Sequence, residues 1–568
     1  MTLRVQLSMQ SFRLLQLAIL AVFLLSSNVC SAQVASIYND ASEDSRRKSE
    51  AEVAEDFHDD FLRDFQFKAV DSGKCEWCHW GDLAGKFSNW TQHSNRLVPI
   101  YTWGIKLDAF DKANSCYRSE ERLKEIYGRL PKETLNPKAD YFDQTDVYLL
   151  QKQAIDAGKK HVIVIIFDGM DWQTTQATAV YQQGKIAYTR GRGTGLAFLD
   201  YKKRLSDYGY FVSSPHNNDS KTDVNAQAVT VQGKRGGGYS AGYGGQRPWS
   251  RPADPNYLRG QRKSLPHGYT DSASSATSMF SGIKTYNAAI NIDPEGKQVT
   301  PIARELQQAG FAIGVVSSVP ISHATPASTY SNNVTRNDYQ DLSRDLLGLK
   351  SISHPEKPLP GVDVLIGCGR TEDKNDDRKK QGKNYIPGNK YLAQKDLDAI
   401  DLHNDGRYRV AQRTEGKAGR RTLLEAAKTA AANNERLLGF YGKGGHLPFR
   451  TADGKYDPTR GIKKAERYSP ADLIENPTLA DMTEAALTVL EKDETGFWLM
   501  IEAGEVDWAS HNNNIDNGIG AVVSGDRAFQ KVVQWVEQNS NWSETAVIVT
   551  ADHGHLMFID DLEVLTGK

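Results

Sequence analysis

The chain has 568 residues, of which 39% are hydrophobic and 25% are charged, and its formal net charge at pH 7 is −2. These values are ordinary for a globular protein with one large domain or two to three smaller ones. The nearly balanced charge gives no support for nucleic acid as a specific partner or for binding to an anionic membrane surface. Any anionic ligand must therefore bind at a local site.

The first predicted element is a signal peptide over residues 1–32. Arg4 and Arg13 precede an apolar stretch from Leu14 to Leu25, and small residues close the segment. This order is typical of a secretory signal, and the apolar stretch is short for a membrane span, which disfavours the alternative of an N-terminal anchor. No later stretch is apolar enough to cross a bilayer. We therefore expect a secreted or periplasmic protein without a transmembrane segment once the signal is removed.

Residues 33–160 are predicted to form a charged, mainly helical N-terminal extension that packs loosely, because charged residues are dense there and no strong strand pattern occurs. In an oxidising compartment Cys75 and Cys78 could pair with each other or with Cys116, and the sequence leaves the connectivity open. Cys75, Cys78 and His79 also match the attachment pattern of haem c. No cytochrome-like sequence surrounds them, so we do not expect a haem.

A different pattern begins at residue 161. Continuous apolar runs of strand length start at His161, Phe311, Leu437, Phe497 and Thr545, with helical patterns between them. Apolar strands that alternate with helices indicate an α/β fold of three layers, with a mostly parallel central sheet and helices on both faces. Residues 161–568 are therefore predicted to form one catalytic domain, with surface insertions near residues 185–265 and 350–435.

Potential metal ligands follow three of the predicted strands. They are Asp168, Glu502, Asp507, His511, Asp552 and His553. Each acidic residue alone could be an ordinary capping group, but the carboxyl ends of parallel strands share one edge of a sheet, so we expect these side chains to lie together. Asp507 and His511 are four residues apart and face the same side of a helix. Carboxylates with imidazoles favour zinc, whereas carboxylates with hydroxyls favour magnesium.

The segment "YTDSASSATSMFSG", which begins at Tyr269, carries a candidate nucleophile. Asp271 and Ser272 precede small residues that are compatible with a helix. A serine at the start of a helix lies where the helix dipole favours a bound phosphate. The alternative is an ordinary capped helix, because Asp and Ser are common at helix starts.

These segments together resemble the alkaline phosphatases. The motifs "FDGMD", "TDSASSAT", "HATPAS", "EAGEVDWASH" and "TADHGH" occur in the order found in that family. Arg336 lies 11 residues after Thr325, where the family has an arginine that binds phosphate. The resemblance covers about residues 161–345 and 437–557. It implies an enzyme with two zinc ions and one magnesium ion.

The resemblance also implies a role for each matching residue. Ser272 would be the nucleophile that forms a phosphoserine, and Arg336 would bind two phosphate oxygens. The implied metal ligands are Asp168, Ser272, Asp552 and His553 for one zinc, Asp507 and His511 for the second zinc, and Asp168, Thr325 and Glu502 for the magnesium.

Two features depart from the family pattern. His323 and Trp508 stand where some relatives have Asp and Lys, which implies a weaker or more exchangeable magnesium. Relatives also supply a further histidine after the "TADH" segment as a third protein ligand of the second zinc, and no counterpart follows His553 here. His555 is the candidate substitute, although a supporting role beside Asp507 is the favoured alternative.

We therefore expect an exported, metal-dependent phosphomonoesterase that acts on small phosphate monoesters and, by analogy with the family, forms a homodimer. One alternative is a phosphodiesterase of the same superfamily, and another is a metal-depleted, non-catalytic relative that binds phosphate. The sequence pattern of sulfatases is absent at residues 272–276.

Overall fold

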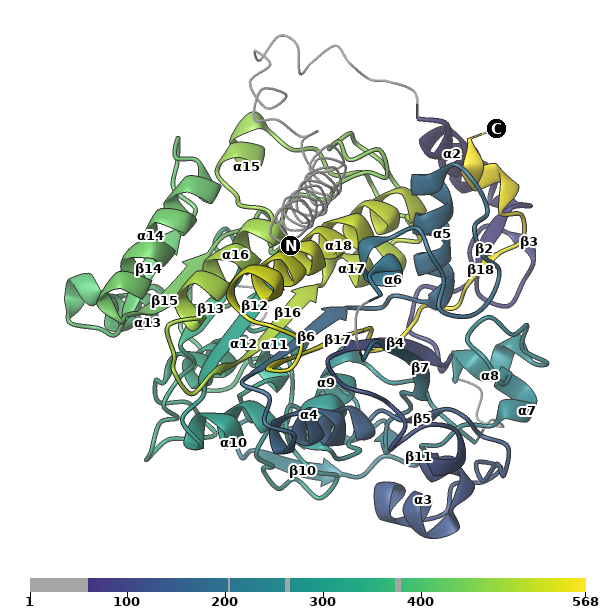
Figure 1. The fold of residues 1–568 in the computed structure, drawn as a ribbon, viewed down its shortest axis with the longest axis horizontal. Coiled ribbons are helices and arrows are strands. Elements are labelled where there is room, and N and C mark those ends of the chain that lie inside the picture. Colours follow the sequence, from purple (N-terminus) through teal and green to yellow (C-terminus); the bar gives the residue numbers. More distant parts are fainter. Residues whose placement is uncertain (1–59, 203–204, 261–265, 373–379, 568) are drawn as a thin grey trace, which may run out of the picture. The chain divides into compact units, whose positions relative to one another are not determined.

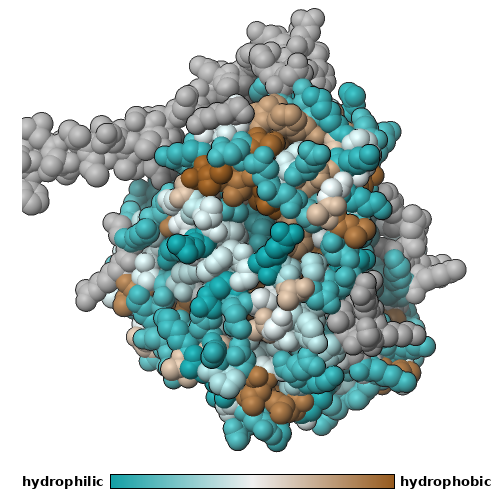
Figure 2. Space-filling model, turned by 90° about the vertical axis from the view of Figure 1, so that its right-hand side faces the viewer, coloured by the Kyte–Doolittle hydropathy of each residue, from teal (hydrophilic) through white to brown (hydrophobic). Residues whose placement is uncertain are grey.

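The computed structural model describes residues 60–202, 205–260, 266–372 and 380–567. The predicted signal peptide and the first part of the predicted extension lie outside these ranges. Among the described helices, none combines the length and the apolar character that a membrane crossing requires. On the face drawn in Figure 2, hydrophilic side chains predominate and apolar ones lie in small separate groups. That distribution is typical of a surface in contact with water.

A ten-stranded mixed sheet forms the centre of the fold (Figure 1), in the order β14-β15-β13-β12-β16-β6-β17-β4-β7-β5. Its strands are β4 (Val98–Trp103), β5 (Phe142–Asp143), β6 (His161–Phe167), β7 (Asp207–Val212), β12 (Ala312–Pro320), β13 (Val364–Cys368), β14 (Tyr408–Gln412), β15 (Arg436–Phe440), β16 (Phe497–Ala503) and β17 (Thr545–Thr550). The strands from β14 to β17 in this order are parallel, and β4 is antiparallel to both β17 and β7. The predicted α/β class with a mostly parallel sheet is confirmed.

Helices cover both faces of this sheet, which explains the continuous apolar runs of its middle strands. In β6, for example, every side chain from Val162 to Phe167 is buried. One layer contains α5 (Trp172–Gln183), α16 (Leu479–Leu490) and α18 (Ile515–Asn539). The other contains α4 (Asp146–Asp156), α9 (Ser272–Ser281) and α10 (Ile302–Gln308). A strand between two helical layers has no polar face, so period-two alternation is lost.

The predicted loosely packed extension over residues 33–160 is wrong for its described part. Strand β4 lies inside the central sheet between β17 and β7, and all six of its residues are buried. The strand signal is weak there because the run "VPIYTW" is short, contains a proline and is surrounded by charged segments. Part of the predicted extension therefore belongs to the core of the protein.

The two stretches predicted as surface insertions also contribute to the sheet. Residues 185–265 contain β7, and residues 350–435 contain β13 and β14. Strand β13 is fully buried between β12 and β15. The sequence pattern did not reveal these strands, because each has only five or six residues and is flanked by polar or glycine-rich segments.

The first described residues pack beside the last ones. Helix α2 (Phe61–Ser72) shares a hydrophobic core with strand β2 (Cys78–Trp80), and β2 pairs antiparallel with β18 (Met557–Ile559). After β2 the chain runs along the segment that follows β17, where the Ser94 backbone N–H donates to the Gly554 carbonyl oxygen at 2.7 Å. This pairing holds the loop around residue 93 against the segment that follows β17.

Cys75 and Cys78 lie next to each other in the same small core. Their Sγ atoms are 3.8 Å apart, and the residues are 4% and 0% exposed. Cys116 lies elsewhere, with its Sγ 3.6 Å from a carboxylate oxygen of Asp146. Of the pairings that the sequence left open, the geometry favours Cys75 with Cys78. Both cysteines belong to the hydrophobic core that α2 and β2 share.

Candidate active site

The predicted site residues come together at the carboxyl-terminal edge of the sheet. Asp168 follows β6 and Asp552 follows β17, two neighbouring parallel strands. Asp507 and His511 lie on α17 (Glu505–His511), which begins directly after β16. The strand order thus places three ligand-bearing strand ends side by side, as expected for ligand sites of α/β sheets.

Ser272 is the first residue of α9 and is 1% exposed. Asp271 caps this helix, because its side chain accepts a hydrogen bond from the Ser274 backbone N–H at 3.0 Å. The cap fixes the helix start, so the serine hydroxyl lies at the positive end of the helix dipole. Small residues continue the helix, which lets α9 pack closely under the site.

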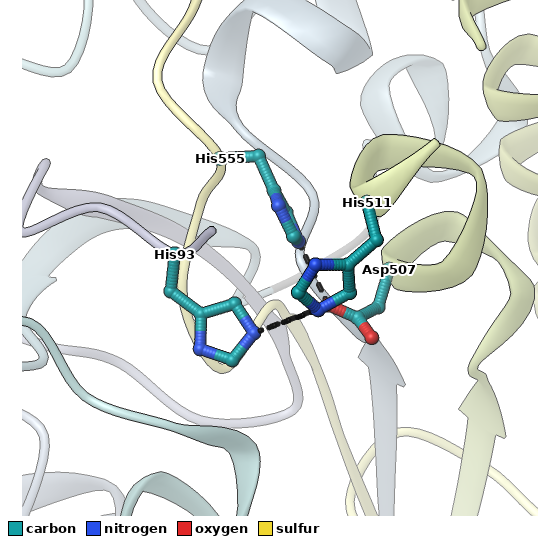
Figure 3. A group of neighbouring side chains, drawn as sticks. All are labelled: His93, Asp507, His511 and His555. Atoms are coloured by element: carbon teal, nitrogen blue, oxygen red, sulfur yellow. Dashed lines mark hydrogen bonds and ion pairs between the residues drawn. The ribbon is translucent and has the colours of Figure 1, made fainter. Parts of the chain in front are cut away.

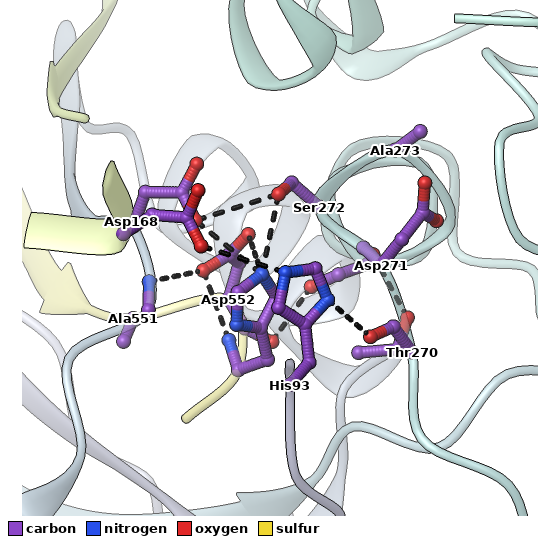
Figure 4. Close-up of polar contacts among 12 residues, drawn as sticks. His93, Asp168, Thr270, Asp271, Ser272, Ala273, Ala551 and Asp552 are labelled. Carbon is purple, nitrogen blue, oxygen red and sulfur yellow. Dashed lines mark hydrogen bonds and ion pairs between the residues drawn. The ribbon is translucent and has the colours of Figure 1, made fainter. Parts of the chain in front are cut away.

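Around this hydroxyl lies a first set of candidate ligand atoms, which we call the serine group: Ser272 Oγ, Asp168 Oδ1, Asp552 Oδ2 and His553 Nε2. Figure 4 shows Asp168 and Asp552 beside Ser272. Ser272 Oγ is 3.4 Å from Asp168 Oδ1 and 3.2 Å from His553 Nε2. His553 Nε2 is also 3.4 Å from Asp168 Oδ1 and 3.3 Å from Asp552 Oδ2. Zinc–ligand bonds of about 2.0–2.2 Å in a tetrahedron put neighbouring ligand atoms about 3.3–3.5 Å apart. These four distances therefore match the spacing of neighbouring zinc ligands.

The electrostatics of this pocket fit a cation. Burial and the neighbouring carboxylates of Asp552, Asp507 and Glu502 raise the pKa of Asp168 well above its ordinary value. Burial also lowers the pKa of His553 well below its ordinary value, so its imidazole is neutral. A divalent cation would neutralise the crowded carboxylates and accept the lone pair of the neutral imidazole.

A second set of ligand atoms lies beside the first. We call it the His93 group: His93 Nε2, Asp507 Oδ1 and His511 Nε2 (Figure 3). His93 Nε2 is 3.2 Å from His511 Nε2 and 3.4 Å from Asp507 Oδ1, and His511 Nε2 is 3.4 Å from the same oxygen. This nearly equilateral triangle is again the spacing of zinc ligands, and it leaves a fourth position open.

In both imidazoles of the His93 group, the Nδ1 atom makes a hydrogen bond to a backbone carbonyl oxygen. His93 Nδ1 lies 2.9 Å from the Thr270 carbonyl oxygen, and His511 Nδ1 lies 2.5 Å from the Thr91 carbonyl oxygen. A carbonyl oxygen can only accept, so each Nδ1 carries a hydrogen, and in the neutral imidazole Nε2 offers its lone pair to a metal. This is the usual way in which a protein orients a histidine toward a metal.

His555 is placed differently. Its Nε2 lies 2.7 Å from Asp507 Oδ1, which is a hydrogen-bond distance and too short for two ligands of one zinc ion. Gly169 makes room for this imidazole: it has φ +74°, and a Cβ there would come within 2.7 Å of His555 Nε2. The geometry therefore favours the supporting role that the sequence left as the alternative for His555.

A third set of side chains offers oxygen atoms only. Asp168 Oδ2, Thr325 Oγ1 and Glu502 Oε1 are buried and have no hydrogen-bond partner within the described ranges. Ser317 Oγ holds the other carboxylate oxygen of Glu502 at 2.5 Å, and burial raises the pKa of Glu502 to about 7. Thr325 lies on α11 (Ala324–Ser328), which packs against β16. Three unsatisfied buried oxygens from these side chains match the donor type that magnesium prefers.

Arg336 reaches the same site from the loop before α12 (Tyr339–Leu347). Its guanidinium donates to Asp271 at 3.0 Å and lies 3.3 Å from His323 Nε2. Burial and the arginine charge lower the pKa of His323 to about 3, so the neutral imidazole accepts from Arg336. Arg336 and Ser272 line one cavity, so the guanidinium is available to an anion bound at the serine.

His93 is the residue that sequence reasoning missed. It lies in the predicted extension, 418 residues before His511, and no motif marks it. The only signal is a histidine shortly before the short apolar run of β4. The third candidate ligand of this group thus comes from the N-terminal side of the sheet and not from a segment after β17.

The fold and these groups define an α/β protein with a candidate multi-metal centre around a serine. A family model described as alkaline phosphatase matches residues 257–565, which is more than half of the chain. The protein belongs to the alkaline phosphatase family. Asp168 and His93 both lie outside the matched range.

Curated relatives agree with this assignment. The chain is 29% identical over 307 residues to alkaline phosphatase 3 of Bacillus subtilis, with 52% of each chain covered. It is 28% identical over 319 residues to the alkaline phosphatase of Escherichia coli, with 53% of this chain and 61% of that protein covered. The chain thus spans between about half and two thirds of the length of these relatives. The solved alkaline phosphatase of the Antarctic bacterium TAB5 matches at 20% identity and a TM-score of 0.41, with 70% of this chain and 80% of that chain covered.

Proposed function

We propose that the protein is an exported, metal-dependent phosphomonoesterase that hydrolyses phosphate monoesters through a phosphoserine on Ser272. The observation that carries the proposal is the serine group, in which Ser272 Oγ lies at a helix start, 3.4 Å from Asp168 Oδ1 and 3.2 Å from His553 Nε2. The export part of the proposal rests on the predicted signal peptide alone.

Three metal ions fit the donor sets. We assign one zinc to the serine group, a second zinc to the His93 group, and a magnesium to the oxygens of Asp168, Thr325 and Glu502. When bound, such ions would acidify the serine hydroxyl and stabilise charge on the attacking and leaving oxygens. The donor sets match the preferences of the two metals, since imidazoles occur in the first two groups and only oxygens in the third.

The protein side chains perform the rest of the reaction. Ser272 Oγ attacks the phosphorus, an Oγ–P bond forms, and the ester P–O bond breaks to release the alcohol. Arg336 binds phosphate oxygens from the side, and Asp271 keeps its guanidinium in position. Water then attacks the phosphoserine, so the Oγ–P bond breaks, phosphate leaves and the serine regains its proton.

The test is hydrolysis of p-nitrophenyl phosphate at alkaline pH with zinc and magnesium present. Ser272→Ala should lower kcat by more than about 10³-fold, because the group that forms the covalent bond is gone. Ser278→Ala is the matched control, since this buried hydroxyl of the same helix bonds only to the Ser274 carbonyl oxygen. Equal activity of the parent and Ser272→Ala, with equal metal content, would refute the phosphoserine.

Two alternatives remain outcomes of the same assay. Faster hydrolysis of bis-p-nitrophenyl phosphate than of the monoester would indicate a phosphodiesterase. A metal-depleted phosphate-binding protein would bind phosphate without turnover. We favour the enzyme because His93 adds a third candidate ligand to Asp507 and His511 in the His93 group. The sequence alone predicted that this group lacks a third protein ligand.

A further inference from the structure

The cavity over the candidate active site is larger than a phosphate group needs. Its volume is about 550 Å³, within the range of about 300–1,000 Å³ that holds organic ligands of moderate size. Ser272 and Arg336 line one part of it, and the residues around His511 line another. The remaining wall comes from residues 449–468, which connect β15 to α15 (Pro470–Ile474).

This wall segment is fixed to the metal-binding helix. The backbone N–H of Ile462 donates to the Asn512 carbonyl oxygen at 2.8 Å, and that of Lys463 donates to the Asn512 side chain at 2.7 Å. Asn512 follows His511, a member of the His93 group. Lys463 and Lys464 therefore stand on the side of the cavity formed by the His93 group. This is the leaving-group side if the second zinc stabilises the leaving oxygen while the serine group holds the attacking one.

The acidic residues of the wall that line the cavity are Asp457 and Glu466. Asp457 lies 3.1 Å from Arg63, which also faces Asp453 and Asp516, and Glu466 lies 3.2 Å from His446. Lys463 and Lys464 also line the cavity, and neither ammonium group has an ion-pair partner in the part of the chain that the structure describes. The cavity thus presents two ammonium groups on this side in addition to the Arg336 guanidinium at the phosphate position.

We propose that Lys463 and Lys464 are specificity-determining residues that favour monoesters whose alcohol part carries a second anionic group, a carboxylate or a phosphate. This inference rests on the proposed phosphomonoesterase function and names its preferred substrate class. A second anion would reach the lysines while Arg336 and the serine bind the phosphate that is transferred. The attraction is strongest at low ionic strength, because both lysines are exposed and salt screens them.

The test compares two substrates of similar size, 3-phosphoglycerate and glycerol 3-phosphate, which differ in a carboxylate. For the parent we expect kcat/KM to be about 3- to 10-fold higher for 3-phosphoglycerate at low ionic strength, with the ratio falling toward one in high salt. The double variant Lys463→Gln/Lys464→Gln should lose this ratio and keep its activity on glycerol 3-phosphate. Replacement of both lysines by arginine should preserve the ratio.

Lys455→Gln is the matched control, because this lysine lies in the same segment, 3.9 Å from Asp453, and should not change the ratio. The same comparison with fructose 1,6-bisphosphate and fructose 6-phosphate distinguishes a phosphate from a carboxylate as the second anion. Activity on glycerol 3-phosphate with no preference in the parent, or a preference that survives the glutamine variant, would overturn this inference alone. Inactivity toward every monoester would refute the phosphatase proposal and this inference with it.

Discussion

The serine group and the His93 group lie side by side, yet the chain builds them in different ways. The serine group is formed by the ends of β6 and β17 and by the start of α9, and its Asp168, Asp552 and His553 side chains are fully buried. The His93 group joins helix α17 to a loop from the N-terminal region, and its His511 side chain is 27% exposed. A sheet edge thus fixes one group, whereas a contact between distant segments fixes the other. We expect the two groups to differ in how tightly they hold metal.

Metal removal should have the largest effect and should separate the two groups. We expect a chelator to lower activity by more than about 10³-fold, because charge on the reacting oxygens is no longer stabilised. The more exposed His93 group should lose its ion first, which gives two phases of zinc release measured by a colorimetric indicator. Release of all zinc in one phase would contradict the difference between the groups.

Substitution of His93 should damage only the second group. His93→Ala removes one of three ligands, so we expect one zinc per chain instead of two and a loss of activity of more than about 100-fold. His403→Ala is the control, since that side chain is 81% exposed and belongs to none of the candidate metal groups. Full zinc content in His93→Ala would show that the loop does not supply a ligand.

Substitution of His555 should have a smaller effect than substitution of His93. His555→Ala removes a hydrogen bond to Asp507 and no ligand, so we expect both zinc ions to remain at saturating metal and activity to fall about tenfold. Zinc content and turnover should be measured together. A loss of zinc equal to that of His93→Ala would instead make His555 a ligand.

The oxygen-only set should give the smallest effect. Thr325→Val removes one oxygen donor, and we expect magnesium to lose its stimulation of activity while zinc content stays the same, with at most about a tenfold fall in turnover. Thr329→Val is the matched control, because that hydroxyl donates to the Pro326 carbonyl oxygen at 2.6 Å. The magnesium content of the parent after extensive dialysis also tests the predicted weak occupancy. Full magnesium after dialysis would contradict the weak occupancy, and unchanged stimulation in Thr325→Val would remove the assignment of magnesium to these oxygens.

The sequence predicts the serine group well because its residues follow long apolar runs. A strand such as β6 is recognisable from its run of seven mostly apolar residues. In a parallel sheet the residue that follows such a strand lies at the carboxyl-terminal edge. The parallel sheet, its helical layers and the clustering of Asp168, Asp552 and His553 all follow from this pattern. Family motifs then single out Ser272 and Arg336.

The His93 group could be predicted only in part. Asp507 and His511 are four residues apart on one helix, which the sequence reveals, but no local pattern connects His93 to them. That contact depends on the antiparallel pairing of β4 with β17 and on the backbone contact between Ser94 and Gly554. Such long-range pairings depend on how whole elements pack together. They cannot be predicted from the local sequence of a six-residue strand that contains a proline.

The distance in sequence between His93 and His511 also sets when the site can form. The two imidazoles are 418 residues apart, and a ribosome adds about 5–20 residues per second, so about 20–80 s separate their synthesis. During that interval His93 has neither of its neighbouring ligands. If the proposed second zinc binds at the His93 group, its capture must be a late event in the maturation of this protein, because the first and last parts of the described chain have to meet before it.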